Sequence, residues 1–454
     1  MFTAINPATG ETVAEYSPTS SPDMRAALRA GDKAWQTWRR TSFPERARLL
    51  VVVGQLLRAR ADRYGRLMAL EMGKPIAGGR AEVEKCATAC DYYAQHAERF
   101  LADEMIATDA SRSYVHHEPI GAVLAIMPWN FPFWQVVRFA APTLMAGNVA
   151  LLKHAANVPG CAIAIEELFR DAGFPTGVFQ NLLIDHVQLR SVIRHPAVAA
   201  VTLTGSTRAG RAVAKQAGDH LKKTVLELGG SDPYLILEDA DLELAVEACV
   251  TSRLINSGQS CIAAKRFIVV DTVRAEFEER FVVRMTQAKM GDPLDESNTV
   301  GPQARRDLRD ALQAQVEQSL AQGARCLLGG VVPPGPGAFY PPTVLTDVAK
   351  GMAAYGEELF GPVAAIIPAR NEKAAIKVAN DTRFGLGAAV FTRDVARGER
   401  IAAQELAAGS CFVNAFVRSD SRLPFGGIKE SGYGRELSHH SLREFVNVKT
   451  VYVK

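Results

Sequence analysis

Two patterns of apolar and polar residues alternate along the middle of the chain, one typical of buried strands and one of helices. Together they predict a sheet flanked by helices. Five segments have the length and apolar character of buried strands, at residues 121–127, 149–152, 178–184, 198–203 and 223–228. Four segments between them place apolar residues at helical spacing, at residues 134–145, 160–172, 187–194 and 209–221. Apolar strands joined by helices are typical of a parallel sheet with helices on both faces.

The pattern changes on either side of this region. Before it we predict a hairpin, three helices and an exposed strand, at residues 1–17, 22–39, 44–72, 79–100 and 111–118. Ser21 and Ser42 stand at two of the helix starts and are the expected caps. After it, a second alternating region spans residues 233–407, followed by a strand at 410–414. Residues 445–453 alternate cleanly, so they form a strand that pairs either within the chain or with an edge of another subunit.

Composition and charge exclude several classes of protein. At 454 residues the chain is long enough for about three domain-sized units, or two with an appendage. The 52 basic and 49 acidic residues leave a net charge of +3 without any basic run, so nucleic-acid binding has no support. Seven scattered cysteines lack zinc-type spacing, which favours a reducing compartment and argues against a bound metal. No apolar run fits a bilayer and no signal peptide is evident, so we expect a cytoplasmic protein that binds no membrane.

The segment Asn256–Cys261 is the strongest candidate for chemistry. It connects a predicted helix at 241–254 to a predicted strand at 267–270, and Gly258 occupies a position where a helix end favours a positive φ. A thiolate fixed in such a turn attacks a carbonyl carbon readily and leaves again. A buried structural cysteine is the plainer interpretation, because free cysteine is among the most buried residue types.

Other motifs place polar groups at the ends of predicted strands. Asn130 lies between two prolines, where its amide can donate hydrogen bonds or simply serve a turn. Glu227 ends an apolar strand, where burial raises a carboxyl pKa and creates a general base, although a salt-bridged glutamate fits the same position. Gly205 and Ser206 open a predicted helix and can meet a phosphate, although the glycine-rich dinucleotide motif is missing. Lys153 ends another strand with a cation.

In this order the motifs resemble the aldehyde dehydrogenase superfamily, and nearly the whole chain takes part. The resemblance rests on Asn6-Pro-Ala-Thr-Gly10, Asn130, Lys153, Thr204-Gly205-Ser206, Glu227-Leu-Gly-Gly230, Gly258-Gln-Ser-Cys261, Glu358-Leu-Phe-Gly-Pro362 and Pro424-Phe-Gly-Gly427. It implies an α/β fold with two parallel-sheet domains, a Rossmann-like NAD(P)-binding domain of residues 1–103 and 120–229 and a catalytic domain of residues 230–435. A β oligomerisation arm, residues 104–119 and 436–454, would make the protein a homodimer or homotetramer.

The resemblance also implies a mechanism. Cys261 would attack the aldehyde carbon, Asn130 would help to stabilise the oxyanion, and Glu227 would activate water to release the acid from a thioester. NAD or NADP would accept the hydride, and no metal would take part. The cofactor-binding residues implied in this way are Met127, Trp129, Lys153, Ala156, Gly205, Ser206, Leu228, Gly229, Glu358 and Phe360.

Within the superfamily the chain is most similar to bacterial NAD(P)-dependent succinate-semialdehyde dehydrogenases. This similarity implies that Arg138 binds the distal carboxylate of succinic semialdehyde, with Ser419 and Phe425 beside it. Many such enzymes carry a second arginine six residues before the catalytic cysteine, where this chain has Ile255. Another small or neutral aldehyde therefore stays open as the substrate. A cysteine esterase or hydrolase that uses Cys261 without a cofactor is the alternative from another class.

The residue three positions after Lys153 bears on the choice between the two cofactors. Strictly NAD-preferring relatives commonly carry a glutamate there, which repels the 2′-phosphate of NADP, whereas this chain has Ala156. Lys153 could then pair with the 2′-phosphate, and His154 would contribute if it were protonated. We expect both cofactors to work, with NADP within about an order of magnitude of NAD.

Overall fold

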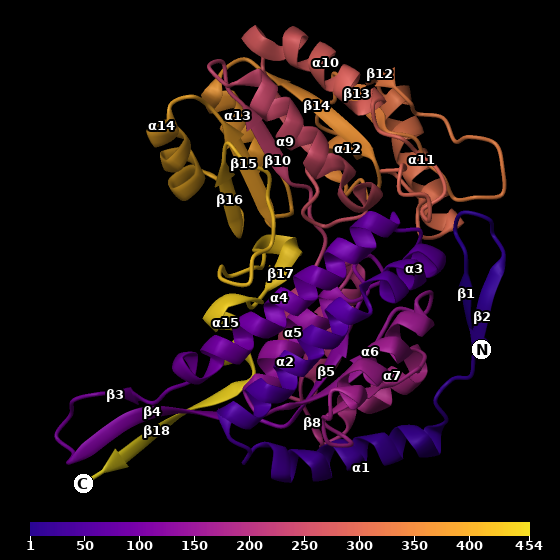
Figure 1. Ribbon diagram of the computed structural model, residues 1–454. Helices are drawn as coiled ribbons and strands as arrows, with labels where there is room; N and C mark the ends of the chain where they lie inside the picture. The colour runs from indigo at the N-terminus through magenta and orange to yellow at the C-terminus, as the bar shows by residue number, and fades with distance from the viewer.

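The apolar runs of the middle region form the strands of a first sheet in the computed structural model, which describes all 454 residues (Figure 1). These strands are β5 (Ala122–Ile126), β6 (Val149–Lys153), β7 (Phe179–Asn181), β8 (Val198–Thr204) and β9 (Lys223–Glu227). They pair in parallel in the order β9-β8-β5-β6-β7. The strand order reverses between β5 and β8, which places a ligand-binding crevice at the carboxyl ends of these strands.

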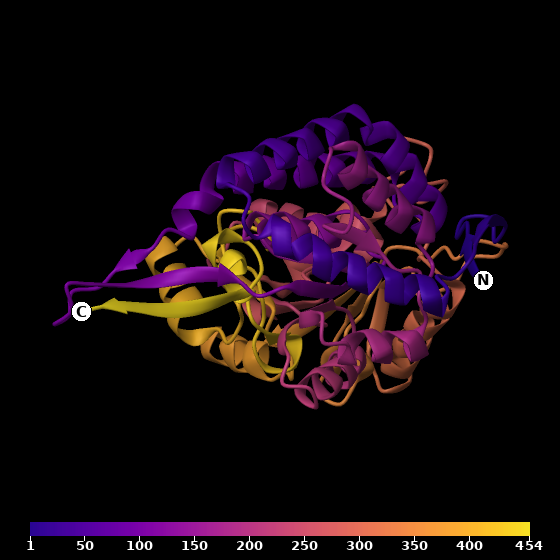
Figure 2. The ribbon, with the colours of Figure 1, turned by 90° about the horizontal axis from the view of Figure 1, so that it is seen from below.

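Helices cover this sheet on both sides. The connecting helices are α5 (Trp134–Met145), α6 (Pro159–Asp171), α7 (His186–Arg194) and α8 (Thr207–Gly218). The preceding helices are α1 (Ser21–Trp38), α2 (Phe43–Ala59), α3 (Ala61–Met72) and α4 (Ile76–Phe100). Helices α2, α3 and α4 pack on one another and on α5, while α1 lies against β5, β6 and β7 (Figure 2). The predicted alternation of strand and helix is therefore confirmed.

Two details of the helices differ from the sequence-based expectation. The helix predicted at 44–72 is two helices, which meet at Arg60, where φ is −111° and ψ is 14°. Ser20 rather than Ser21 caps α1, because its hydroxyl accepts a hydrogen bond from the amide of Asp23 while Ser21 is already helical. Ser42 caps α2 as expected.

The second alternating region forms a second sheet, shown at the top of Figure 1. Its strands are β10 (Pro233–Ile236), β11 (Arg266–Val270), β12 (Arg325–Leu328), β13 (Thr343–Thr346), β14 (Val363–Ala369), β15 (Gly387–Phe391) and β16 (Ser410–Val413). Its helices are α9 (Leu242–Leu254), α10 (Asp271–Thr286), α11 (Arg306–Ala321), α12 (Ala353–Gly356), α13 (Glu372–Asn380) and α14 (Val395–Arg400). The strand order is β12-β13-β14-β11-β10-β15-β16, and only β12 runs antiparallel to its neighbour.

The two sheets meet end to end. Residues 228–232 connect the carboxyl end of β9 directly to the amino end of β10, and the parallel strands β11, β14 and β15 begin at the same edge. A further short strand, β17 (Gly432–Tyr433), pairs antiparallel with the end of β9, with Gly432 opposite Glu227. The sequence did not predict this pairing. The active-site residues therefore come from carboxyl ends in one sheet and amino ends in the other.

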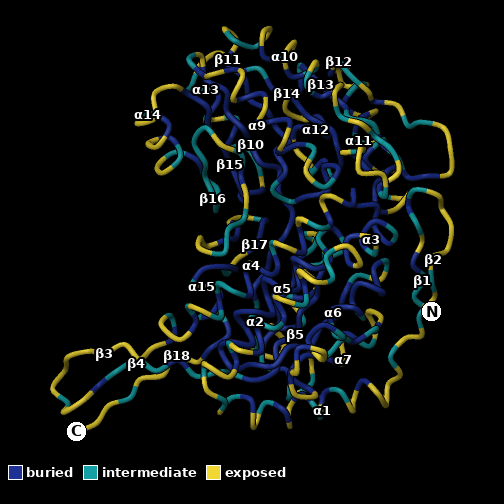
Figure 3. Tube along the Cα trace, viewed as in Figure 1, coloured by how far each residue is buried: buried dark blue, intermediate teal, exposed yellow.

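A three-stranded arm projects from the body of the molecule (Figures 2 and 3). It consists of β3 (Glu104–Met105), β4 (Arg112–Pro119) and β18 (Val446–Val453), and helix α15 (Ser438–Glu444) leads into it. Strand β18 pairs along its whole length with β4 of the same chain, which settles the alternative left open for residues 445–453. The predicted hairpin near residue 1 is β1 (Phe2–Ile5) with β2 (Thr12–Tyr16). None of the helices combines the length and the apolar character needed to cross a membrane.

Candidate active site

The turn that carries Cys261 has an unusual backbone. Helix α9 ends at Leu254, and the next residues form a short 3-10 turn in which Asn256, Ser257 and Gly258 have φ of 53°, 56° and 76°. The positive φ predicted for Gly258 is confirmed. A side chain there is also impossible for steric reasons, because a Cβ atom would lie 2.2 Å from the carbonyl carbon of Gly361. Three successive left-handed residues therefore turn the chain sharply between α9 and Cys261.

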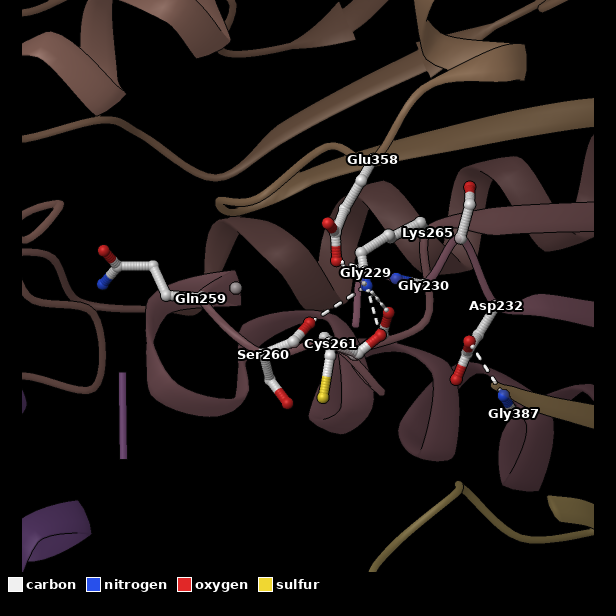
Figure 4. A network of polar contacts seen from close by, with 12 residues as sticks. Gly229, Gly230, Asp232, Gln259, Ser260, Cys261, Lys265, Glu358 and Gly387 are labelled. Carbon is white, nitrogen blue, oxygen red and sulfur yellow. Dashed lines mark hydrogen bonds and ion pairs between the residues drawn. The ribbon is translucent and has the colours of Figure 1, made fainter. Parts of the chain in front are cut away.

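Lys265 holds this turn together (Figure 4). Its buried ammonium donates hydrogen bonds to the carbonyl oxygens of Ser260 at 3.0 Å, Cys261 at 2.7 Å and Ala263 at 3.0 Å. Burial lowers the pKa of Lys265, while the nearby Glu358 carboxylate, 3.9 Å away, acts in the opposite direction. Sequence reasoning missed this residue. The only available signal was a lysine immediately before an otherwise apolar strand.

Cys261 is half-buried, and its surroundings govern its protonation. Burial raises the pKa of the thiol to about 12, and the positive charges of Arg138 and Lys265 oppose this rise. Glu358 and Glu227 act in the same direction as burial. Four of the other six cysteines, Cys249 among them, are fully buried in the core, whereas Cys326 is exposed and Cys411 is half-buried. Cys261 therefore combines limited access with nearby cations, which a purely structural cysteine does not need.

Asn130 lies against the Cys261 turn, as the sequence predicted. It follows β5, and its Nδ2 donates to the carbonyl oxygen of Gln259 at 3.0 Å. Asn256 donates in return to the backbone carbonyl of Asn130 at 2.6 Å. One N–H of the Asn130 amide uses the contact to Gln259, and the second stays available to an oxyanion formed beside Cys261.

Glu227 occupies the carboxyl end of β9 and is almost fully buried, with 2% of its surface exposed. Neither carboxylate oxygen has a hydrogen-bond partner. Burial raises the pKa of Glu227 well above its ordinary value, and the neighbouring Glu436 raises it further, while Arg138 and Arg435 act in the opposite direction. A buried, unpartnered carboxyl with a raised pKa is suited to accept a proton from water near neutral pH.

Arg138 is paired within the chain. Its buried guanidinium forms an ion pair with Glu436, donates from Nη2 to Thr204 Oγ1 at 3.3 Å, and lies 5.0 Å from the ring centroid of Phe425. A carboxylate of the same chain thus pairs with this guanidinium, and the sequence-based role of Arg138 in substrate binding stays a prediction. Sequence reasoning missed Glu436, which reaches this position through backbone hydrogen bonds to Phe425.

The residues expected to hold the cofactor's adenosine and phosphates meet at the crevice where the first sheet reverses its order. Lys153 ends β6, is buried, and has no acidic partner, so burial lowers its pKa. Ser206 is exposed and caps α8 by accepting a hydrogen bond from the amide of Ala209 at 3.3 Å, and Gly205 precedes it. A buried cation without a counterion and an open helix N-terminus fit an anionic dinucleotide.

The residues expected near the nicotinamide ribose lie beside the second sheet. Glu358 accepts a hydrogen bond from the amide of Gly230 at 3.0 Å, and a Cβ atom on Gly229 would lie 2.5 Å from its carboxylate. Phe360 packs edge-on against Trp129, with ring centroids 5.7 Å apart. Met127 donates a backbone hydrogen bond to Lys153, and Leu228 donates one to Ser431.

His154 does not have the role that the sequence left open. The ring is buried, with Nε2 3.0 Å from the carbonyl oxygen of Pro132, and Nδ1 accepts a hydrogen bond from the amide of Ala155. Burial lowers the pKa of His154 to about 4, so the ring is neutral and adds no charge for a 2′-phosphate. Ala156, in contrast, is exposed, so the loop presents no carboxylate at this position that would repel the extra phosphate.

Comparison with known proteins agrees with this geometry. A family model described as the aldehyde dehydrogenase family matches residues 1–451. The chain is 50% identical over 449 residues to the NAD(P)+ succinate semialdehyde dehydrogenase of Escherichia coli K12. The aligned region covers 99% of this chain and 97% of that protein. It is 49% identical over 452 residues to the NADP+ succinate-semialdehyde dehydrogenase 1 of Mycobacterium tuberculosis H37Rv, covering 99% of each.

Solved structures give the same result. The crystal structure of succinic semialdehyde dehydrogenase from Streptococcus pyogenes in complex with NADP+ superposes with a TM-score of 0.98 at 37% identity and covers 100% of both chains. The match extends over both sheets and the arm, since no part of either chain is left out. The turn around Cys261, the contacts of Asn130, the buried carboxyl of Glu227 and these similarities lead to one conclusion: the chain belongs to the aldehyde dehydrogenase family.

Proposed function

We propose that the protein oxidises an aldehyde to a carboxylic acid with NAD or NADP, and that succinic semialdehyde is the substrate, giving succinate. One observation carries the reaction: Cys261, Asn130 and Glu227 come from three distant parts of the chain and meet at the junction of the two sheets. The substrate is supported by relatives at 49–50% identity whose names specify succinate-semialdehyde dehydrogenase. The sequence-based roles of Ser419 and Phe425 as substrate contacts stay predictions.

In this proposal the Cys261 thiolate attacks the aldehyde carbon, and the carbonyl π electrons move to oxygen. The free N–H of Asn130 and the backbone N–H of Cys261 donate to that oxygen, and each donor of this kind is worth about 3–4 kcal/mol in the transition state. The charges of Arg138 and Lys265 favour the thiolate that starts the reaction. Lys265 keeps the attacking sulfur in place by fixing three carbonyls of its turn.

The residues at the crevice fit a nicotinamide dinucleotide. Lys153 and Ser206 would hold the adenosine ribose and the phosphates, while Glu358 and Phe360 would hold the nicotinamide ribose and ring. When bound, the dinucleotide supplies the two-electron acceptor that the oxidation requires. Ala156 is exposed and carries no charge that would repel a 2′-phosphate, so we propose that both cofactors are used.

Oxidation of the Cys261 adduct leaves a thioester, and Glu227 then completes the reaction. Its carboxylate accepts a proton from water as the water oxygen attacks the thioester carbon, and the sulfur leaves as thiolate. Because both oxygens of Glu227 lack partners, no internal hydrogen bond has to break first. A base in this position favours release of a free acid over transfer of the acyl group to another carrier.

We further propose that residues 1–103 and 120–229 act as the cofactor domain and residues 230–435 as the catalytic domain. The arm of residues 104–119 and 436–454 would join subunits in a homodimer or homotetramer. The exposed outer edges of its three-stranded sheet support this role, because unpaired strand edges bind other chains.

A substrate panel tests the function. Succinic semialdehyde, butanal and an activated ester are offered to the protein with NAD, with NADP and without cofactor, and the near-ultraviolet absorbance of reduced nicotinamide is followed. We expect reduction of both cofactors, a preference for succinic semialdehyde, and no activity in Cys261→Ala. Ester hydrolysis without any oxidation of aldehydes would instead support a cofactor-independent hydrolase. A preference for butanal would retain the reaction and exclude the proposed substrate.

A further inference from the structure

The loop that carries Asn130, residues 127–133, leads into helix α5 without a cap of its own. The residue before α5 is Phe133, whose side chain cannot accept a hydrogen bond from the first amides of the helix. The amides of Phe133 and Trp134 nevertheless both have a partner, since each donates at 2.9 Å to the same carboxylate oxygen of Glu82. Glu82 belongs to α4, which is outside both sheets. An acceptor from another element therefore fixes the point where the Asn130 loop becomes helical.

The second oxygen of Glu82 is engaged by Lys74. The two side chains form an ion pair, and only 2% of the Lys74 side chain and 1% of the Glu82 side chain are exposed. The ammonium of Lys74 also lies 3.8 Å from the centroid of the Phe131 ring, which belongs to the Asn130 loop. Burying an ion pair gains little stability over apolar residues of similar volume, so stability alone does not account for this pair. It does commit each oxygen of Glu82 to one partner, the ammonium or the amides of α5.

The position of the Asn130 loop matters because only one donor of Asn130 is available to an oxyanion. The other N–H of its amide is bonded to the carbonyl oxygen of Gln259. Asn256 holds the loop at the backbone carbonyl of Asn130, and Glu82 holds it at the start of α5. A catalytic donor acts only when it is already in place, and a displacement of about 1 Å can lower a rate by about 10²-fold. The contacts of Glu82 are therefore coupled to the geometry of the reaction.

Glutamine at position 82 cannot replace the carboxylate, although it has nearly the same size. A carboxylate accepts hydrogen bonds at both oxygens, whereas the glutamine amide has one oxygen and one NH2 group. If its oxygen faces the amides of α5, its NH2 group meets the ammonium of Lys74, which is also a donor. If its oxygen faces Lys74, the amides of Phe133 and Trp134 lose their acceptor. Either orientation leaves buried donors unpaired and favours a shift of the loop.

A second buried glutamate makes the same kind of contact at a different helix. Glu71 accepts hydrogen bonds from the amides of Gly160 and Cys161, at 2.8 and 2.9 Å, at the start of α6. Helix α6 follows strand β6 and does not carry the Asn130 loop. A substitution of Glu71 therefore separates the general cost of losing a buried cap from any effect that depends on Asn130.

We propose that Glu82, held by Lys74, is a positioning residue of the oxyanion site, which fixes the start of α5 and thereby keeps the free N–H of Asn130 where the oxyanion forms. This inference rests on the proposed function and extends it to a helix outside the two sheets. In this role Glu82 acts through Asn130 and takes no part in bond making or breaking. An oxyanion forms both when Cys261 attacks the aldehyde and when water attacks the thioester, so loss of Glu82 slows both steps.

The first test follows reduced nicotinamide by rapid mixing, with saturating cofactor and the aldehyde that the wild type oxidises fastest. Glu82→Gln should slow the first turnover and lower kcat by roughly ten- to a hundredfold, while calorimetry shows unchanged cofactor binding. The control Glu71→Gln should lower the melting temperature but keep both rates within about twofold of the wild type. The double variant Lys74→Met/Glu82→Met leaves no unpaired buried ion, so it should fold and show the same slowing even if Glu82→Gln does not fold.

A double-mutant cycle with Asn130→Ala separates this inference from the proposed function. Asn130→Ala alone should slow the first turnover by about 10²- to 10³-fold, the cost of removing an oxyanion donor. Adding Glu82→Gln, or the double methionine variant, should then change the rate by less than about twofold, because the donor that Glu82 positions is already absent. Additive losses, an unchanged first turnover in the folded Glu82 variants, or equal slowing in Glu71→Gln would overturn the inference and leave the proposed function intact. An unchanged rate in Asn130→Ala would refute the oxyanion role of Asn130 in the proposed function, and the inference with it.

Discussion

Replacing Glu227 by glutamine separates the two halves of the proposed reaction. Glutamine has nearly the same size and shape as glutamate but cannot accept the proton of the attacking water. Attack by Cys261 and oxidation of its adduct do not require this base, so the thioester should form at a normal rate and then persist. General bases contribute about 10²- to 10⁴-fold to a rate, and we expect steady-state turnover to fall by a factor in this range.

Rapid mixing with saturating cofactor and aldehyde provides the assay. Glu227→Gln should release one equivalent of reduced nicotinamide per subunit in a burst, followed by the slow steady state. Glu243→Gln, which changes an exposed carboxylate at the start of α9, is the control and should behave like the wild type. A slow reaction without a burst would show that Glu227 acts before the thioester forms. Undiminished steady-state turnover would show that Glu227 has no role in the reaction.

The raised pKa of Glu227 adds two pH-dependent expectations. Only the deprotonated carboxylate acts as a base, so turnover limited by hydrolysis should increase with pH through a value above 4.5, and Glu227→Gln should lose this dependence. The folded state holds the proton of Glu227 more tightly than the unfolded state does, so stability is lost as pH rises through the raised pKa. Glu227→Gln should therefore raise the melting temperature at alkaline pH and have little effect near pH 4, as calorimetric scans would reveal.

Three further substitutions test other parts of the site. Ala156→Glu should shift the ratio of kcat/KM values towards NAD, whereas a wild type that rejects NADP by about a thousandfold would show that another residue sets the preference. Arg138→Met should slow oxidation of succinic semialdehyde and butanal alike, because it unpairs buried Glu436 beside Glu227; a loss confined to succinic semialdehyde would instead support the sequence-based assignment of Arg138 to substrate binding. Lys265→Met should lower the unfolding free energy by about 1–3 kcal/mol or more, because three buried carbonyls lose their donor, and an unchanged denaturation midpoint would contradict this role.

The central strands of the first sheet could be predicted because they are buried on both faces, which requires continuous apolar runs such as 121–127. Asn130 and Glu227 could be found because they follow or end such a run, and Cys261 because it lies in the turn between a predicted helix and a predicted strand. Residues whose role depends on a partner far along the chain left no local pattern. In the sequence, Lys265 looks like a polar residue at the start of a strand, and only the structure shows its ammonium bonded to three carbonyls. The role of Glu436 likewise depends on its ion pair with Arg138, which the sequence does not reveal.

The same limit applies to two other residues. The ion pair of Arg138 with Glu436 is a tertiary contact that the spacing of Arg138 does not report. His154 is a titratable residue in sequence, but burial against Pro132 keeps its ring neutral.

Strand β9, which carries Glu227, acquires one of its two neighbours only from residues near 432. During synthesis the parallel strands β5 to β9 are therefore complete long before β17 can pair with the edge of β9. Strand β4 likewise is synthesised long before its partner β18. Domains begin to fold as they emerge, so a nascent chain exposes two bare strand edges while the second sheet is still being translated. Catalytic competence arrives only after those edges close, and chains stalled before residue 432 are expected to need chaperones to avoid aggregation.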